Sequence, residues 1–175
     1  EDGRRQILNV VMPGDFIGLQ GAVMSKMEHS VESLSDMLLC VFERERLWEL
    51  YRDYPDLAFD VTWLAAREEQ MLDENLLNVG QRSAEERMAY LLLLLFSRAE
   101  IRGMTKGSSV DMPFTQQHIA DTLGLSLVHT NRTLNRLVRR KVVSWKSGTL
   151  RLVNRKTLSE IAGWEGLREG PRPFI

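Results

Sequence analysis

The sequence has few of the side chains that most often carry out chemistry, and each shortage excludes a class of protein. Cys40 is the single cysteine among 175 residues, so no internal disulfide can form, and its place in the apolar run MLLCVF predicts a buried structural thiol. The histidines His29, His118 and His129 are scattered, and neither a phosphate-binding loop nor metal-ligand spacing occurs. An iron–sulfur cluster would need several cysteines. We therefore expect no enzyme and, among these residues, no metal site; an iron–sulfur sensor stays open, because residues upstream could supply more cysteines.

Long apolar runs are also missing. The run Leu91–Phe96 is far shorter than the roughly 20 residues that cross a bilayer, and Arg87 and Arg98 flank it. Nothing resembles a signal peptide. The sequence thus predicts a cytoplasmic protein without a membrane partner. Its composition, 43% hydrophobic and 27% charged, is that of a globular chain.

Positive charge is concentrated in one segment. Between Thr115 and Lys156 stand nine Lys or Arg and one acid, Asp121, a local balance of +8. Since the whole chain carries −1, the other segments carry −9. A basic module within an acidic chain predicts a polyanion-binding domain.

The same segment has the pattern of a helix-turn-helix. The run Phe114–Arg140 predicts two short helices, of which Thr115 can cap the first and Ser126 the second, with the turn at Gly124. Apolar residues at helical spacing form the inward face of the pair: Ile119, Ala120, Leu123, Leu134, Leu137 and Val138.

The outward face of the second helix is predicted to read bases in the major groove, which an α-helix fits. Arg132 is the strongest candidate, because a guanidinium can bond guanine at two points. The other base-contact candidates are Asn131, Leu127 and Val128. Phosphate contacts are expected from Thr115, Gln116, Gln117, Ser126, His129, Arg136 and Lys146. His129 is equally compatible with pairing to the neighbouring turn.

Shorter elements flank this pair of helices. The residues Gly103–Met112 predict a surface loop that marks a hinge or the approach to a strand. The runs Val142–Trp145 and Thr149–Val153 predict a β-hairpin, or wing, with Lys146 at its tip. A last helix is expected over Asn154–Ala162, followed by an extended tail at 170–175.

A long amphipathic helix is predicted between Pro55 and Gly80. About 25 helical residues span nearly 40 Å, more than a compact domain of this size needs for its own core. The helix either pairs with a second copy or lies against its own β-domain. Its apolar seam consists of Leu57, Val61, Leu64, Met71 and Leu72.

A second helix is expected to follow directly. Ser83 and Glu86 have the spacing of a capping box. The run Leu91–Phe96 is apolar on every side, which predicts a buried helix.

The N-terminal third resembles a known domain. The stretches PGDFIGLQGAV and HSVESLSDMLLCVF resemble the closing half of the cyclic-nucleotide-binding β-roll of the Crp/Fnr family of bacterial transcription regulators, and HTNRTL resembles a recurrent recognition helix of that family. A strand is expected over Gln6–Met12, ended by the turn Pro13–Asp15. Because the opening EDGRRQILNVV looks like the middle of a β-domain, we expect further residues upstream.

The resemblance implies an α+β architecture in three parts. Residues 1–54 would be the C-terminal part of a β-roll, a cyclic-nucleotide-binding-like jelly roll. Residues 55–79 would be the dimerisation helix, and residues 80–175 a winged helix-turn-helix domain.

The resemblance also indicates where an effector would bind. In nucleotide-binding members a glutamate bonds the ribose and an Arg-Ser pair bonds the cyclic phosphate; here Leu19 and the pair His29–Ser30 stand at those positions. A neutral imidazole does not replace a bidentate guanidinium, so cyclic AMP is not expected and the cofactor is unspecified. As an alternative, His29 is simply a half-exposed strand residue. The candidate pocket consists of Gly18, Leu19, Gln20, His29 and Ser30.

Taken together, the resemblance implies a homodimeric transcription regulator that binds a two-fold symmetric site on double-stranded DNA and contacts RNA polymerase. A winged-helix module for protein or RNA contacts, with a purely structural β-domain, is the alternative.

Overall fold

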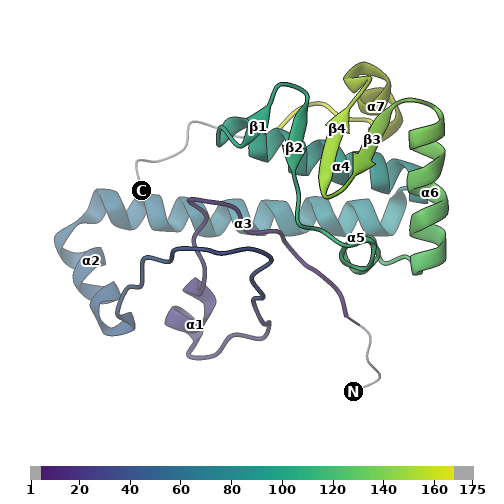
Figure 1. Ribbon diagram of the computed structural model, residues 1–175. Coiled ribbons are helices and arrows are strands. Elements are labelled where there is room, and N and C mark those ends of the chain that lie inside the picture. The colour runs from purple at the N-terminus through teal and green to yellow at the C-terminus, as the bar shows by residue number, and fades with distance from the viewer. Residues whose placement is uncertain (1–4, 168–175) are drawn as a thin grey trace. The chain divides into compact units, whose positions relative to one another are not determined.

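The computed structural model describes residues 5–167. Their contacts divide them into two compact units, residues 5–12 with 72–167, and residues 13–71. The helix α3 (Pro55–Gln81) begins in the second of these units and ends in the first. Figure 1 shows the elements of each unit.

The unit of residues 13–71 is helical and irregular. It contains α1 (Leu19–Met24), a 3-10 turn (Arg44–Arg46), α2 (Leu47–Asp53) and most of α3. Pro55 occupies the first position of α3, where its missing N–H leaves no hydrogen bond unmade. The long helix predicted from the apolar seam is confirmed; it has 27 residues and continues through Gly80, where it was expected to end, to Gln81.

The strand predicted over Gln6–Met12 is not formed, and residues 5–54 contain no strand at all. A strand needs a neighbour, and no segment among these residues supplies one. The extended segment instead bonds helices: Ile7 N–H donates to the Asp121 carbonyl at 3.1 Å, and the Arg98 guanidinium donates to the Val10 carbonyl at 2.7 Å. The predicted α+β class is nevertheless confirmed, because the sheet lies elsewhere.

The expectation of a buried Cys40 is also wrong. Cys40 is exposed, as are its neighbours in the apolar run, with Leu38 95% accessible. Without paired strands the run has no opposing layer to pack against, so apolarity alone did not bury it.

The other unit is a winged helix-turn-helix. Its helices are α4 (Ala84–Ile101), α5 (Gln116–Leu123), α6 (Leu127–Arg139) and α7 (Arg155–Ala162). Its antiparallel sheet has the order β1-β2-β4-β3, built from Thr105–Lys106, Ser109–Asp111, Thr149–Leu152 and Val143–Lys146 in that order. The loop expected over 103–112 is therefore mostly the hairpin β1–β2, which adds two strands to the predicted wing.

The wing turns tightly between β3 and β4. Trp145 pairs with Leu150 and Lys146 with Thr149. Between them Ser147 and Gly148 both have positive φ, 49° and 78°, which defines the type I′ turn that suits the twist of a hairpin. The hairpin predicted from sequence is confirmed.

Helix α4 forms the centre of the core. Every residue from Met88 to Ala99 is buried, which confirms the burial predicted for Leu91–Phe96. The predicted capping box is also present, because Ser83 N–H donates to the Glu86 carboxylate at 2.7 Å and Glu86 N–H donates to the Ser83 hydroxyl. The Ser83 N–H holds the pKa of the Glu86 carboxyl below its usual value.

Replacing Leu92 by alanine should strongly destabilise the protein. Its side chain has no accessible surface, and a cavity at such a site costs about 2 to 5 kcal/mol. Denaturant unfolding measures the loss. Leu38→Ala, at an exposed leucine, should change the free energy of unfolding by less than about 0.5 kcal/mol; similar losses for both variants would contradict the placement of α4 at the centre of the core.

Candidate nucleic-acid interface

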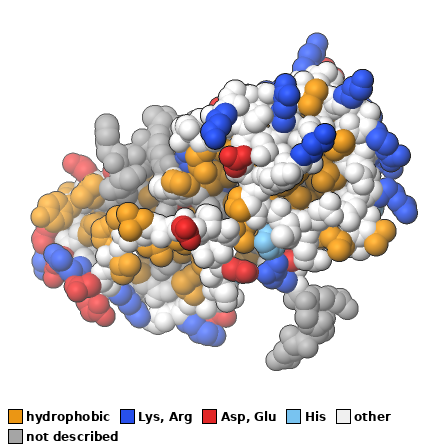
Figure 2. All heavy atoms as spheres, viewed as in Figure 1, with side chains coloured by type: hydrophobic (Ala, Val, Ile, Leu, Met, Phe, Trp, Pro, Cys, Tyr) orange, Lys and Arg blue, Asp and Glu red, His pale blue; other side chains and the backbone are white. Residues whose placement is uncertain are grey.

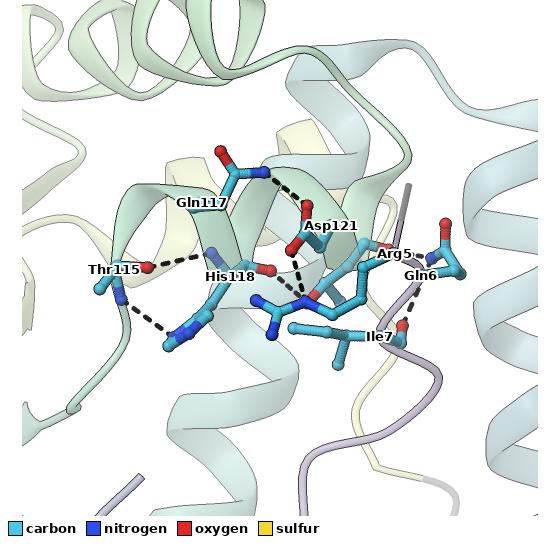
Figure 3. Close-up of polar contacts among 8 residues, drawn as sticks. Arg5, Gln6, Ile7, Thr115, Gln117, His118 and Asp121 are labelled. Atoms are coloured by element: carbon cyan, nitrogen blue, oxygen red, sulfur yellow. Dashed lines mark hydrogen bonds and ion pairs between the residues drawn. The ribbon is translucent and has the colours of Figure 1, made fainter. Parts of the chain in front are cut away.

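The start of each helix of the pair is fixed by a side chain. Thr115 caps α5, with its hydroxyl accepting from His118 N–H at 3.2 Å while the His118 ring accepts from Thr115 N–H (Figure 3). Gly124, at φ +63°, makes the turn, and the Ser126 hydroxyl accepts from His129 N–H at the start of α6. The three residues predicted for caps and turn are confirmed in those places.

Helix α6 has one buried face and one open face. Thr130, Thr133, Leu134 and Leu137 are buried. The opposite face, at spacings of four, three and four residues, carries the exposed side chains of Val128, Arg132, Asn135 and Arg139. This ridge runs the length of the helix, and nothing in the described chain covers it.

The base-contact candidates do not all lie on this ridge. Arg132 lies near its middle, and Val128 is 70% exposed at its start. Leu127 is exposed on the flank. The amide oxygen of Asn131 is buried without a hydrogen-bond partner among the described residues, so that side chain turns inward. Sequence reasoning missed Arg139 as a candidate, although its helical spacing from Val128 was available.

The phosphate candidates are all exposed, and most of them gather at helix starts. Thr115, Gln116 and Gln117 lie at the start of α5, with the Gln117 amide donating to Asp121 at 2.6 Å. Ser126 and His129 lie at the start of α6. Lys146 lies at the tip of the wing, and Arg136 lies on the flank of α6 facing α4.

An N-terminal segment braces α5 (Figure 3). Arg5 Nε lies 2.8 Å from the carboxylate of Asp121, and the Gln6 amide donates to the Thr122 carbonyl at 3.1 Å. Asp121 is the only acid in the basic segment. Its charge is therefore matched by an arginine from outside that segment, so Asp121 neutralises none of the nine cations through this ion pair.

All nine cations of the basic segment are exposed. In Figure 2, Lys and Arg side chains stand along the part of the surface that carries the strands and α6. Glu85 pairs with Arg136 and Arg140, and Glu100 pairs with Arg155. The winged unit thus presents a basic surface around an exposed helix ridge.

The effector candidates lie in the unit of residues 13–71. Gly18, at φ +91°, precedes α1, and Leu19 and Gln20 form its first turn. His29 and Ser30 are exposed in an irregular segment. The Gln20 side chain accepts from Glu28 N–H at 3.4 Å, which brings the two parts of the predicted pocket near each other. Within residues 5–167, no group of three or more His, Cys, Asp or Glu is arranged to hold a metal ion.

The predicted dimer seam on α3 is only partly available. Val61 is 4% exposed, so it has no surface to offer a second copy because its own chain already covers it. Leu57, Leu64 and Met71 are half-buried, whereas Leu72 is exposed. Other exposed apolar side chains of α3 are Phe59, Leu76 and Leu77.

Tyr90 joins the end of α3 to α4. Its hydroxyl donates to Glu74 at 2.7 Å, the Arg82 guanidinium lies 4.0 Å from its ring centroid, and Trp164 packs edge-on against it. Burial, followed by the bond to Glu74, raises the pKa of Tyr90 well above its ordinary value.

None of the described helices is both long and apolar enough to span a bilayer.

Family models match both the N-terminal and the C-terminal part of the chain. A family model described as a Crp-like helix-turn-helix domain matches residues 86–161, and one described as a cyclic nucleotide-binding domain matches residues 1–54.

Two curated relatives are transcriptional activators by name. The transcriptional activatory protein AadR of Rhodopseudomonas palustris is 32% identical over 162 residues, covering 92% of this chain and 66% of AadR. The transcriptional activator protein FnrL of Cereibacter sphaeroides is 29% identical, covering 82% of this chain and 58% of FnrL. The chain therefore spans less than two thirds of the length of these relatives.

Solved structures share the fold. FixK2 from Bradyrhizobium japonicum superposes with a TM-score of 0.60 at 24% identity, covering 67% of this chain and 58% of FixK2. A CooA mutant from Carboxydothermus hydrogenoformans gives 0.56 at 16% identity, covering 67% of this chain and 54% of CooA.

The Tyr90 hydroxyl predicts a pH dependence of stability. Because its pKa is raised in the folded state, its contribution is fully present below the unfolded pKa of about 10 and is lost as the pH rises through the folded value. Tyr90→Phe should lower the free energy of unfolding at neutral pH by about 1 to 3 kcal/mol, since the hydroxyl bonds a charged acceptor. In an alkaline absorbance titration, the variant should lack the tyrosine that ionises last; disappearance of an early one would contradict this arrangement.

Proposed function

The chain belongs to the Crp/Fnr family of bacterial transcription regulators, and we propose that it regulates transcription by binding specific DNA sequences through the open ridge of α6. The observation that supports this most directly is the ridge itself. It is a full helix face with Arg132 near its middle, opposite a face that is buried. A protruding helix of this kind fits the major groove, where base edges differ in donors, acceptors and methyl groups.

Specificity in this proposal comes from a few side chains. Arg132 bonds guanine at two points, Val128 and Leu127 contact thymine methyls or sugar carbons, and Asn135 and Arg139 extend the reading surface. Asn131 takes part only if its amide turns outward. A transcription regulator has no need of catalysis, and we propose no enzymatic activity and a place in the cytoplasm, where bacterial DNA lies.

Affinity comes mainly from the phosphates. The wing tip at Lys146 and the helix starts at Thr115 and Ser126 are exposed around the ridge, where cations, hydroxyls and backbone amides can meet phosphate oxygens. These contacts fix the position of the head without reading sequence.

We further propose that two copies act together, each with three parts: an effector domain over residues 1–54, a dimerisation helix over 55–79 and a DNA-binding domain over 80–175. The exposed apolar side chains of α3, Phe59, Leu72, Leu76 and Leu77, support pairing through that helix. Residues 168–175, including the predicted extended tail, lie outside the described part. RNA polymerase is the expected partner at the promoter. Cyclic AMP is not the effector we propose, because Leu19 is apolar where a ribose acceptor is needed.

Selection of bound sequences from random duplexes tests the dimer. A two-fold symmetric dimer should enrich inverted half-sites whose centres lie about one helical turn apart, or a multiple of it. A single half-site without symmetry would contradict pairing while leaving DNA binding intact.

Replacing Arg132 or Lys146 by alanine separates reading from positioning. Arg132→Ala should reduce discrimination between the selected site and random duplex by about 1 to 3 kcal/mol, or roughly 5- to 150-fold. Lys146→Ala should weaken binding to both duplexes alike and reduce the salt dependence by about one phosphate contact. Fluorescence anisotropy over a salt series measures both. Equal losses on the two duplexes for Arg132→Ala would refute its reading role.

A further inference from the structure

One carboxylate of α4 holds two arginines, Arg136 on α6 and Arg140 directly after the end of α6. Arg136 Nη1 lies 3.0 Å from Glu85 Oε2, and Arg140 Nη1 bonds the other carboxylate oxygen of Glu85. The two arginines are one helical turn apart, so one acid can reach both. They lie beside the reading ridge, on the flank that faces the start of α4.

The position of Glu85 keeps this pairing in place. Glu85 lies in the first turn of α4, where the helix dipole favours a negative charge. Its side chain is only 19% exposed, whereas the two arginine side chains are 54% and 48% exposed. The carboxylate is thus partly shielded from salt, while the arginines remain within reach of a nearby polyanion.

We propose that Glu85 is a positioning residue that withholds Arg136 and Arg140 from DNA phosphates and thereby limits binding to DNA of any sequence; for Arg136 this replaces the phosphate contact expected from sequence. This inference rests on the proposed function. Each phosphate that a protein neutralises steepens the salt dependence of binding by about 0.9 in logarithmic slope. Because these contacts carry no sequence information, they strengthen operator and random DNA together. Withholding two of them lowers the background of random binding against which a site must compete.

A purely structural ion pair would have a different signature. Losing it would lower the free energy of unfolding without changing how DNA binding responds to salt. An acid that presents the arginines to phosphates would also differ, because its loss would weaken binding to every duplex.

Removing the charge of Glu85 tests the proposal. Glu85→Gln should bind random duplex more tightly at low salt. Between about 50 and about 200 mM salt its affinity should fall about tenfold more than that of the wild type, as expected for two added phosphate contacts. Binding to the selected site should gain similarly at low salt.

Three further variants control this result. Glu160→Gln makes the same change in net charge on α7, at an exposed residue with no ion pair in the described part of the chain, and should behave like the wild type. Glu85→Gln combined with Arg136→Ala and Arg140→Ala should lose the added salt dependence. Arg136→Ala with Arg140→Ala alone should change the slope little, because those cations are already withheld. Unfolding curves establish that each variant is folded at the assay temperature.

An unchanged or shallower slope for Glu85→Gln would overturn the proposal, and so would an equal steepening in Glu160→Gln. If wild type and all variants fail to bind duplex DNA in a salt-dependent way, the proposed function fails as well. If the wild type binds its selected site in a salt-dependent way but Glu85→Gln has the same slope as the wild type, only the proposed role of Glu85 is overturned.

Discussion

The winged unit depends on the burial of one helix. From Met88 to Ala99, α4 has no face in solvent, so α5, α6, α7 and the sheet find their positions by packing against it. Burial of this kind contributes roughly 25 cal/mol for each Å² of apolar surface removed from water. Because the core is built around α4, the outward face of α6 is not needed for packing and stays exposed.

Charged residues at both ends of α4 also bind neighbouring helices. In its first turn Glu85 binds two arginines at the C-terminal end of α6, and near its last turn Glu100 binds Arg155 of α7. Tyr90, which lies on α4 between these two acids, bonds Glu74 near the end of α3. The helix that organises the core thus also fixes the flank of the reading helix and the end of the long helix that precedes it.

The winged unit was largely predictable from sequence, because its signals are local. Thr115, Ser126, Gly124 and Ser83 specify caps and turns through bonds to residues three or four positions away. The N-terminal third was not, because a strand over Gln6–Met12 depends on partners that no local pattern reveals. The burial of Cys40 failed for the same reason.

The positions of individual site residues were predictable only in part. Helical spacing placed Arg132 and Val128 correctly on the open face, and extending that spacing would have added Arg139. The inward turn of the Asn131 amide could not be foreseen, since it depends on packing at the edge of the core. The ion pairs of Glu85 join residues more than 50 positions apart, and no sequence pattern links them.

The four tryptophans give this chain natural optical reporters. Trp48 is 81% exposed and Trp63 lies on α3, both within residues 13–71. Trp145 lies in the wing and Trp164 packs edge-on against Tyr90, both in the winged unit. Indole emission shifts to the blue as water is removed from the ring, so single-tryptophan versions would show separately what happens to each half of the molecule. A shift in the emission wavelength of Trp145 on adding duplex DNA would report a change in its surroundings in the wing without any attached dye.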